Sequence, residues 1–361
     1  MGTTSVRDLI RLRIASQRLS GPSLDSPSDV VAALGAVQAQ ELGLALWSLG
    51  QRSDSTADEV RAALDSGAVL RTHVLRPTWH FVPAEDLRWM QRLTHDRIAA
   101  QARYYAGLVG ADEELVGLSF AVFERVLGDG VHRTRAELGA ALVEAGLEVP
   151  PRALPHLTLL AELADLITSG PLRDGRHTYA LVAERVPVGR ELVGDEALAE
   201  LTRRYLAGHG PATVRDLAWW ASLTQPQARR GVQLLGDEVE TLHSDGTEYL
   251  VPADREPAPA PSGAALLQPF DELVVGYSQS RWLAYADPEQ SRNPNTLRYP
   301  LLVDGRVLGW WTVRAEPSTP ISVLATSPRA RAAGAAVELA AAEYAAFAGR
   351  VPTVEWLDTS G

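Results

Sequence analysis

Three short motifs in this chain each predict the start of a helix. In each motif a hydroxyl residue precedes an acidic residue by three positions: Ser26 and Asp29, Thr134 and Glu137, and Thr213 and Asp216. The hydroxyl oxygen can accept from unpaired N–H groups of the first turn, and the acid is favoured at the positive end of the helix. Another helical stretch precedes each motif and strand-forming residues follow it. The chain is therefore expected to repeat a helix-rich unit that ends in a hairpin.

The third repeat shows the order of its elements most clearly. Helices are predicted near residues 196–206, 213–223 and 225–235. Thr224 is expected to cap the last of these. Residues 240–251 then form a predicted hairpin, with Asp245 and Gly246 at its turn. Three helices followed by a hairpin is the order of a winged-helix domain.

The same pattern divides the whole chain. Residues 69–82 are rich in strand formers, and residues 163–182 predict a hairpin with Asp174 and Gly175 at its turn. The Pro/Ala stretch over residues 252–263 marks a linker. We predict a mainly α fold with β-hairpins (α+β), made of three tandem winged-helix motifs followed by a β-rich C-terminal domain. The predicted boundaries are 1–105, 106–190, 191–252 and 264–361.

The residues after the linker are predicted to be mostly strands. Residues 266–277 and 298–314 are strand-like, the latter with Asp304-Gly305 at a hairpin turn. A long Ala-rich helix is expected after Ser327, and residues 351–357 are expected to form a last strand. Together they predict a small α+β or barrel-like domain.

Composition excludes several classes of protein. The 361 residues contain no cysteine, which excludes disulfides, thiolate metal sites and cysteine nucleophiles. The histidines lack metal-ligand spacing, and neither a phosphate-binding glycine loop nor a Gly-x-Ser-x-Gly elbow is present. We expect no metal and no cofactor. The N-terminus lacks a long apolar core and no stretch is long enough to span a membrane, so a cytoplasmic protein is expected.

Every side chain in the total of lysine plus arginine is an arginine, because the chain has no lysine. Guanidinium groups bind phosphate in bidentate fashion, and arginines cluster in the predicted helical repeats. The clusters are Arg7, Arg11, Arg13 and Arg18; Arg133, Arg135 and Arg152; Arg203 and Arg204; and Arg229 and Arg230 in the predicted recognition helix. The net charge of −11 argues against a nucleic-acid partner. A local basic face can coexist with an acidic back, however, and we predict that Arg229 and Arg230 bind DNA.

Gln38 and Gln40 are candidate catalytic residues. On a helix, side chains two residues apart diverge by about 200°, so these amides converge only where the helix ends or opens. Gly43 indicates such a break. Amide oxygens can orient water and interact with positive charge. The alternative is a structural role, in which one glutamine binds the backbone and the other faces solvent.

A second candidate group contains Arg76, Thr78 and His80. Alternation along a strand would place these three side chains on one face, where they can meet a phosphate or a base edge. Trp79 and Phe81 would then face the core. The alternative is a wing strand that holds a hydrogen-bonded histidine.

Asp271 and Glu272 form a third candidate, because adjacent acids suggest a general acid or base. A strand would send their side chains to opposite faces. Such a pair more often stabilises a turn or the end of a sheet.

Four segments together resemble the AlkZ/YcaQ family of winged-helix DNA glycosylases. They are residues 37–40 (VQAQ), 73–90 (HVLRPTWHFVPAEDLRWM), 266–277 (LLQPFDELVVGY) and 301–311 (LLVDGRVLGWW). The resemblance spans nearly the whole chain and implies a concave DNA-binding surface. The catalytic motif is Gln-x-Gln in the AlkZ-like branch and Gln-x-Asp in the YcaQ-like branch. Gln38-Ala39-Gln40 is similar to the AlkZ-like motif, which implies catalytic roles for Gln38 and Gln40.

The resemblance also implies a substrate. AlkZ-like members are associated with self-resistance in bacteria that make DNA-alkylating natural products such as azinomycin, hedamycin and trioxacarcin. It implies a monofunctional enzyme, acting as a monomer, that removes N7-alkylated guanine from double-stranded DNA, including bulky adducts or interstrand crosslinks. Without lysine, no side-chain amine can form a Schiff base. The competing interpretations are a non-catalytic winged-helix transcription regulator and an acidic interaction scaffold.

Overall fold

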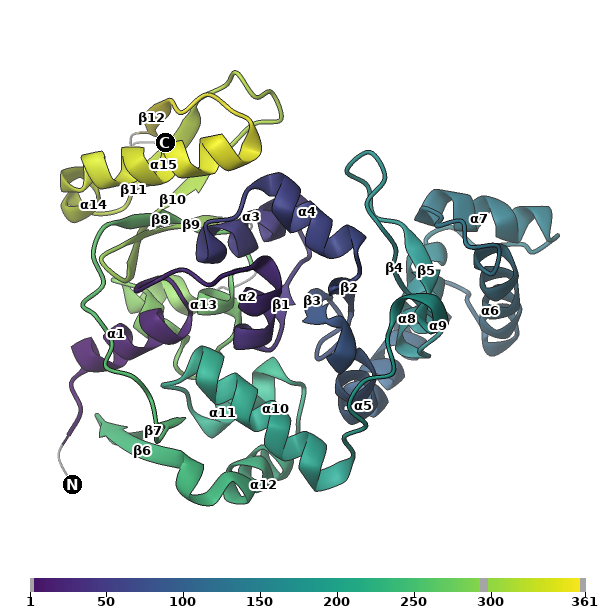
Figure 1. The fold of residues 1–361 in the computed structure, drawn as a ribbon, viewed down its shortest axis with the longest axis horizontal. Coiled ribbons are helices and arrows are strands. Elements are labelled where there is room, and N and C mark those ends of the chain that lie inside the picture. Colours follow the sequence, from purple (N-terminus) through teal and green to yellow (C-terminus); the bar gives the residue numbers. More distant parts are fainter. Residues whose placement is uncertain (1–2, 293–297, 358–361) are drawn as a thin grey trace. The chain divides into compact units, whose positions relative to one another are not determined.

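The computed structural model describes residues 3–292 and 298–357, which pack into two compact units (Figure 1). Unit 1 consists of Met1–Val60 and Ala199–Gly361, and unit 2 consists of Arg61–Leu198. Unit 1 thus joins the start of the chain to its C-terminal half. The boundaries predicted for the four domains were drawn from motifs along the sequence. They stay a prediction.

The helices of unit 1 include α1 (Val6–Ser16), α2 (Pro27–Leu34), α3 (Leu42–Ser53), α11 (Val214–Trp220) and α12 (Gln225–Leu235), while α4 (Ala57–Asp65) and α10 (Gly194–His209) reach across the unit boundaries. Three of them, α2, α11 and α12, begin where a predicted cap stands. The Ser26 side chain accepts from the Asp29 N–H at α2. Thr213 and Asp216 form a complete capping box at α11, and Thr224 caps α12. These local predictions are confirmed.

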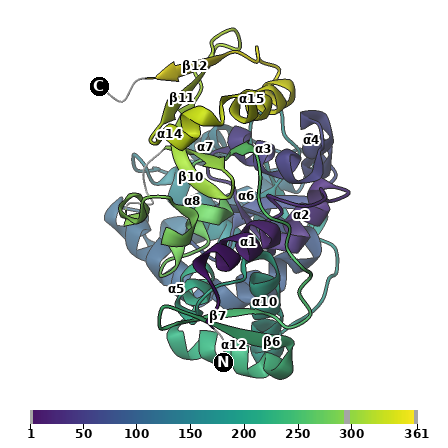
Figure 2. The ribbon, with the colours of Figure 1, turned by 90° about the vertical axis from the view of Figure 1, so that its left-hand side faces the viewer.

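The hairpin of the third repeat also forms as expected. Strand β6 (Val239–Ser244) pairs antiparallel with β7 (Thr247–Pro252). Asp245 and Gly246 between them have φ values of 46° and 74°. Positive φ at both central residues is what a two-residue type I′ turn requires. Figure 2 shows α1 beside this hairpin, and the Thr4 N–H ahead of α1 donates to the His243 carbonyl at 2.8 Å.

A five-stranded sheet follows the linker, in the order β12-β11-β10-β9-β8. Its strands are β8 (Ala264–Leu266), β9 (Tyr299–Val303), β10 (Arg306–Thr312), β11 (Ile321–Ala325) and β12 (Val354–Leu357). Only the β11–β12 pair among the described strands of this sheet is parallel. Helix α15 (Gly334–Ala348) packs on the sheet through Val337 and Tyr344, which share a core with Trp47 of α3 (Figure 1).

Two predictions for this region are wrong in detail. The strand expected over residues 266–277 ends at Leu266, and the short helix α13 (Glu272–Val275) follows. Pro269 cannot donate to a strand ladder, and the Asp271 side chain caps the helix by accepting from the Leu273 N–H at 3.0 Å. The helix expected after Ser327 is also divided, into α14 (Pro328–Ala332) and α15.

Unit 2 contains two antiparallel hairpins and a helical core. Its elements are β2 (Val69–His73), β3 (Trp79–Pro83), α5 (Leu87–Leu108), α6 (Glu113–Leu127), α7 (Arg135–Glu144), α8 (Leu154–Leu163), β4 (Ile167–Ser169), β5 (Tyr179–Leu181) and α9 (Val182–Arg185). Strand β2 pairs with β3, and β4 pairs with β5. Phe123 and Leu157 lie in the apolar core that the helices enclose. The strands predicted within residues 69–82 and 163–182 are therefore present.

Within the described parts of the chain, no helix combines the length and the apolar character that crossing a membrane needs.

Candidate active site

Gln38 and Gln40 lie in the connection between α2 and α3. Helix α2 ends at Leu34 because Gly35 takes a φ of +76°, which favours glycine. Gln38 belongs to the two-residue strand β1 (Val37–Gln38), and Gln40 lies in a bend before α3. The expectation that these residues sit in a helix broken near Gly43 is wrong, because the helix ends earlier.

The two glutamines differ in their exposure. Gln38 is 5% exposed, whereas Gln40 is exposed. The side-chain Oε1 of Gln38 is buried and has no hydrogen-bond partner among the described residues. A buried acceptor without a partner costs about 1–3 kcal/mol. The Gln38 amide oxygen therefore keeps its full capacity to accept a hydrogen bond or to interact with a positive charge.

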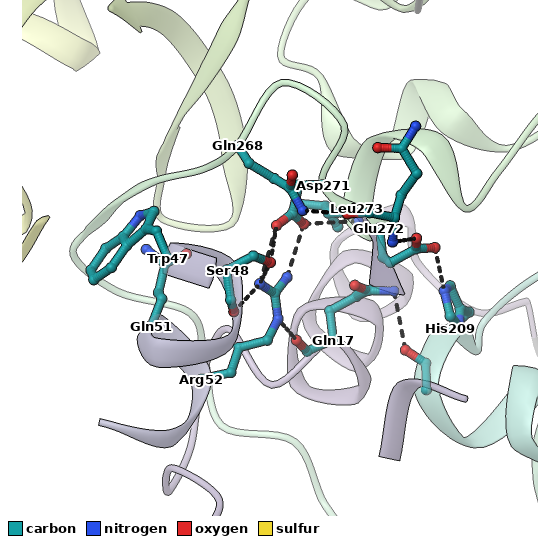
Figure 3. A network of polar contacts seen from close by, with 12 residues as sticks. Gln17, Trp47, Ser48, Gln51, Arg52, His209, Gln268, Asp271, Glu272 and Leu273 are labelled. Atoms are coloured by element: carbon teal, nitrogen blue, oxygen red, sulfur yellow. Dashed lines mark hydrogen bonds and ion pairs between the residues drawn. The ribbon is translucent and has the colours of Figure 1, made fainter. Parts of the chain in front are cut away.

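The Gln38 main chain is held on both sides by the segment that begins at Gln268. The Gln268 Nε2 donates to the Gln38 carbonyl at 3.0 Å, and the Gln38 N–H donates to Glu272 Oε1 at 2.8 Å. Gln268 and Glu272 are both fully buried. Figure 3 shows both side chains, with Gln268 shortly before α13 and Glu272 at the first residue of that helix. We call this pair of contacts the Gln38 clamp.

Glu272 makes further contacts through its second oxygen. Its Oε2 accepts from the Trp220 Nε1 at 2.9 Å and lies 3.1 Å from the His209 Nε2. Because a carboxylate accepts through both oxygens, one side chain binds the Gln38 N–H and two aromatic rings at once. His209 and Tyr205 stack with 4.7 Å between their ring centroids. Glu272 is therefore fixed by the packing around α10 and α11.

Asp271 neutralises a buried arginine beside the clamp (Figure 3). Arg52 Nη2 and Nη1 donate to the two Asp271 carboxylate oxygens at 2.8 and 3.1 Å, and both side chains have no exposed surface. Ser48 also donates to Asp271, at 3.2 Å. A bidentate pair of this kind fixes orientation as well as charge. The two adjacent acids thus stabilise a turn and a helix end. This is the structural interpretation of the pair, as opposed to a role as general acid or base.

Arg76, Thr78 and His80 belong to unit 2, and the structure brings them together. Arg76 Nη2 lies 3.0 Å from His80 Nε2, and His80 Nδ1 lies 2.8 Å from the Thr78 carbonyl oxygen. Because a guanidinium only donates and a carbonyl only accepts, His80 is the neutral tautomer with its proton on Nδ1. His80 is fully buried, so it supports Arg76 from within the unit. The Thr78 Oγ1 has no hydrogen-bond partner in the described structure.

Trp79 does not enter the apolar core, contrary to the alternation argument. Strand β3 begins only at Trp79, so Arg76 and Thr78 precede it. The indole is half-buried, and the Arg71 guanidinium carbon stacks 3.6 Å from its ring centroid. His73 and His177 lie 5.1 and 5.2 Å from the ring, centroid to centroid. Phe81, by contrast, is buried as predicted.

A buried carboxylate in unit 2 gave no signal in the sequence. Glu162 is fully buried, and its Oε2 accepts from the His73 N–H at 2.8 Å and lies 2.6 Å from His73 Nδ1. Glu162 and His73 are 89 residues apart, and Glu162 lies outside the motifs found in the sequence. Burial lowers the pKa of the nearby His177 well below its ordinary value, with Arg71 contributing.

The arginine clusters divide into exposed and structural members. Arg229 and Arg230 are exposed on α12, as a DNA-binding role requires. Arg13 is buried instead, and it donates to the Ser280 carbonyl at 2.8 Å. Other arginines of these clusters form ion pairs with acidic residues: Arg203 and Arg204 with Glu200, Arg203 with Glu238, and Arg133 with Asp129. Four of the clustered arginines outside α12 therefore have a structural role: Arg13, Arg133, Arg203 and Arg204.

The fold that carries these residues matches that of a solved DNA glycosylase. Among solved structures, the Streptomyces sahachiroi DNA glycosylase AlkZ matches with a TM-score of 0.81. The match covers 99% of this chain and 100% of that chain at 23% sequence identity. At this identity the likeness shows a common fold. It agrees with the predicted mixed α+β architecture.

The family is shown by the sequence itself. The family model described as DNA glycosylase AlkZ-like matches residues 31–347, most of the chain, so the chain belongs to the AlkZ-like DNA glycosylase family. A search of the curated proteins finds no match. The predicted resemblance is confirmed, and the chain is a DNA glycosylase, an enzyme of DNA repair.

Proposed function

We propose that this glycosylase is monofunctional and hydrolyses the N-glycosidic bond of N7-alkylated guanine in double-stranded DNA. Its substrates include bulky adducts or crosslinks left by a genotoxic natural product of the azinomycin, hedamycin or trioxacarcin type, so that it provides self-resistance. The observation that carries the proposal is the Gln38 amide oxygen, which is buried and has no partner among the described residues. A neutral acceptor of this kind suits a base that is already cationic.

The chemistry needs little from the enzyme. Alkylation at N7 gives guanine a positive charge, so the bond from C1′ to N9 breaks with its electron pair passing to the base, which leaves neutral. The sugar becomes oxocarbenium-like, as in glycoside hydrolysis. The water oxygen bonds to C1′ and its proton passes to solvent. An amide oxygen can orient that water and stabilise the sugar cation. A neutral amide is too weak an acid to protonate an unmodified purine, which would otherwise have to leave as an anion.

Each predicted site residue has a place in this mechanism. Gln38 and Gln40 orient the water and stabilise the sugar cation. Arg229 and Arg230, exposed on α12, contact phosphates. In unit 2, Arg76 and Thr78 contact DNA, while the buried His80 holds the Arg76 guanidinium.

The absence of lysine supports a monofunctional reaction. Bifunctional glycosylases cleave the strand through a Schiff base, and lysine is the side chain whose amine can form one. This chain has no lysine, so the reaction is expected to stop at the abasic site. The DNA strand should stay intact until alkali is added.

The test is a double substitution at the glutamines. Gln38→Ala with Gln40→Ala should abolish excision of N7-methylguanine from a duplex, measured as alkali-labile sites, and should change the Kd for that duplex by less than about threefold. The control is Gln51→Ala, because Gln51 on α3 donates to the Leu266 carbonyl at 3.4 Å and leaves the Gln38 clamp intact. The control should excise at the rate of the unaltered protein.

Three outcomes would contradict the proposal. Loss of DNA binding in step with loss of excision would show that the glutamines are structural. An unaltered protein that leaves no alkali-labile sites in alkylated DNA would refute the substrate assignment. Strand breaks without alkali would refute the monofunctional product.

A further inference from the structure

The geometry points to Gln268 and Glu272 as positioning residues for Gln38. They contact the carbonyl and the N–H of the same residue, at 3.0 and 2.8 Å. The inference rests on the proposed catalytic role of Gln38. It adds that the C-terminal segment, more than 200 residues away in sequence, sets where the Gln38 amide is presented.

The clamp acts on the main chain, and this is why it orients the side chain. The two hydrogen bonds fix the peptide groups on both sides of the Gln38 Cα, and these fix the direction in which the side chain leaves the backbone. The connection between α2 and α3 contains no helix of its own. Fixed contacts from Gln268 and Glu272 therefore replace the rigidity that a helix would supply, and a displacement of about 1 Å can cost about 100-fold in rate.

The two clamp residues are themselves buried. Glu272 is fully buried and is bound through its other oxygen by Trp220 and His209. Gln268 is also fully buried. A charged acceptor gives a stronger bond to the Gln38 N–H than a neutral one would. The position of Gln38 is thus coupled to two side chains that are packed inside unit 1.

A glutamine at position 268 does not give the fold its greatest stability. Its Nε2 donates to Gln38, but its Oε1 is buried with no partner in the described residues. An apolar residue of similar size would avoid burying that oxygen, and such a replacement can be nearly neutral in stability. What leucine at this position would lose is the bond that holds the Gln38 carbonyl.

The variants separate positioning from stability. Gln268→Leu removes the bond to the Gln38 carbonyl. Glu272→Leu removes the bond to the Gln38 N–H, whereas Glu272→Gln keeps an oxygen that can accept it. Gln17→Leu is the matched control, because Gln17 is fully buried and its Nε2 donates to a carbonyl at 3.1 Å, that of Gly208. It thus loses an equivalent bond to a carbonyl, together with a bond to the Tyr277 hydroxyl at 3.3 Å, and neither bond involves Gln38.

Three measurements are made on each full-length variant. The single-turnover rate of N7-methylguanine excision reports the chemistry, the Kd for the same duplex reports binding, and hydrogen exchange of the peptide that contains Gln38 reports the clamp itself. The folded fraction comes from circular dichroism.

We expect Gln268→Leu to lower the excision rate about 10- to 100-fold with Kd within about twofold and the Gln38 peptide exchanging faster. Glu272→Gln should retain more of the rate than Glu272→Leu, and Gln17→Leu should leave rate and exchange unchanged. If Glu272→Leu fails to fold, the excision rates and the hydrogen exchange of Gln268→Leu and Glu272→Gln test the inference.

An unchanged rate in folded Gln268→Leu would overturn the inference, and so would an equal loss in Gln17→Leu. The proposed function fails separately, if the unaltered protein excises nothing. In that case faster exchange at Gln38 in Gln268→Leu supports the clamp, and unchanged exchange overturns it.

Discussion

Two adjacent carboxylates in unit 1 have different tasks, and the difference lies in their partners. Asp271 gives both oxygens to Arg52, with neither side chain exposed. Glu272 divides its oxygens between the Gln38 N–H and the rings of Trp220 and His209. The first contact balances a buried charge, and the second holds a candidate catalytic residue.

At Arg52 and Asp271 the expected effect is on stability. Asp271→Ala should lower the free energy of unfolding of unit 1 by about 3–5 kcal/mol, because it leaves the Arg52 charge buried without its partner. Replacing both residues with apolar side chains, Arg52→Met with Asp271→Leu, should cost less than Asp271→Ala alone. Urea unfolding followed by circular dichroism measures both. A loss below about 1 kcal/mol for Asp271→Ala would show that the charge is compensated elsewhere.

At the scale of elements, helix α7 shows how a cap couples folding to pH. Thr134 and Glu137 form a complete capping box at its start. The Thr134 N–H, followed by the Arg173 guanidinium and the Thr134 hydroxyl, lowers the pKa of Glu137 from 4.5 to about 2. A carboxyl whose folded pKa is depressed stabilises the fold above its unfolded pKa, and this contribution disappears as pH falls toward the folded value.

Helix α7 should therefore lose protection in acid. As pH falls from about 4.5 to about 2, hydrogen exchange in α7, corrected for the intrinsic rate, should accelerate relative to α15 as the capping carboxylate becomes protonated. Glu137→Gln can keep the box but cannot titrate, so its α7 exchange should be flat relative to α15 in this window. The same acid response in Glu137→Gln would assign the effect to another group.

At the scale of the whole molecule, the charge must be reconciled with a DNA substrate. The net charge is −11, and the chain has no lysine. Several arginines are paired with acids or buried, as Arg203 and Arg13 are. The exposed pair Arg229 and Arg230 on α12 is where a local basic surface can oppose the overall repulsion.

DNA binding should accordingly depend steeply on salt. The salt dependence is the slope of a plot of log Kd against log salt concentration. Arg229→Gln and Arg230→Gln should each lower this slope by about 1, because each variant loses one phosphate contact. Fluorescence anisotropy with a labelled duplex measures this. Arg152→Gln, outside α12, is the comparison and should keep the slope. A flat salt response in the unaltered protein would contradict phosphate binding by these arginines.

The local features of this fold were predictable because the interacting atoms lie within a few residues of one another. The capping pair Thr213 and Asp216 is three residues apart, and the Asp245-Gly246 turn needs only two adjacent residues that tolerate positive φ. The Gln-x-Gln motif could be found in the same way, and its order with the other motifs led to the family. All of these are properties of short segments.

The surroundings of the motif were decided by the tertiary structure. The Gln38 N–H meets an acid 234 residues away, and its carbonyl meets an amide 230 residues away. Arg13 and Trp79 took unexpected environments for the same reason, since burial depends on what distant segments bring to a side chain. Short-range hydrogen bonding and backbone sterics therefore placed the helices and turns from sequence alone, whereas long-range packing determined which polar groups are buried and what they contact.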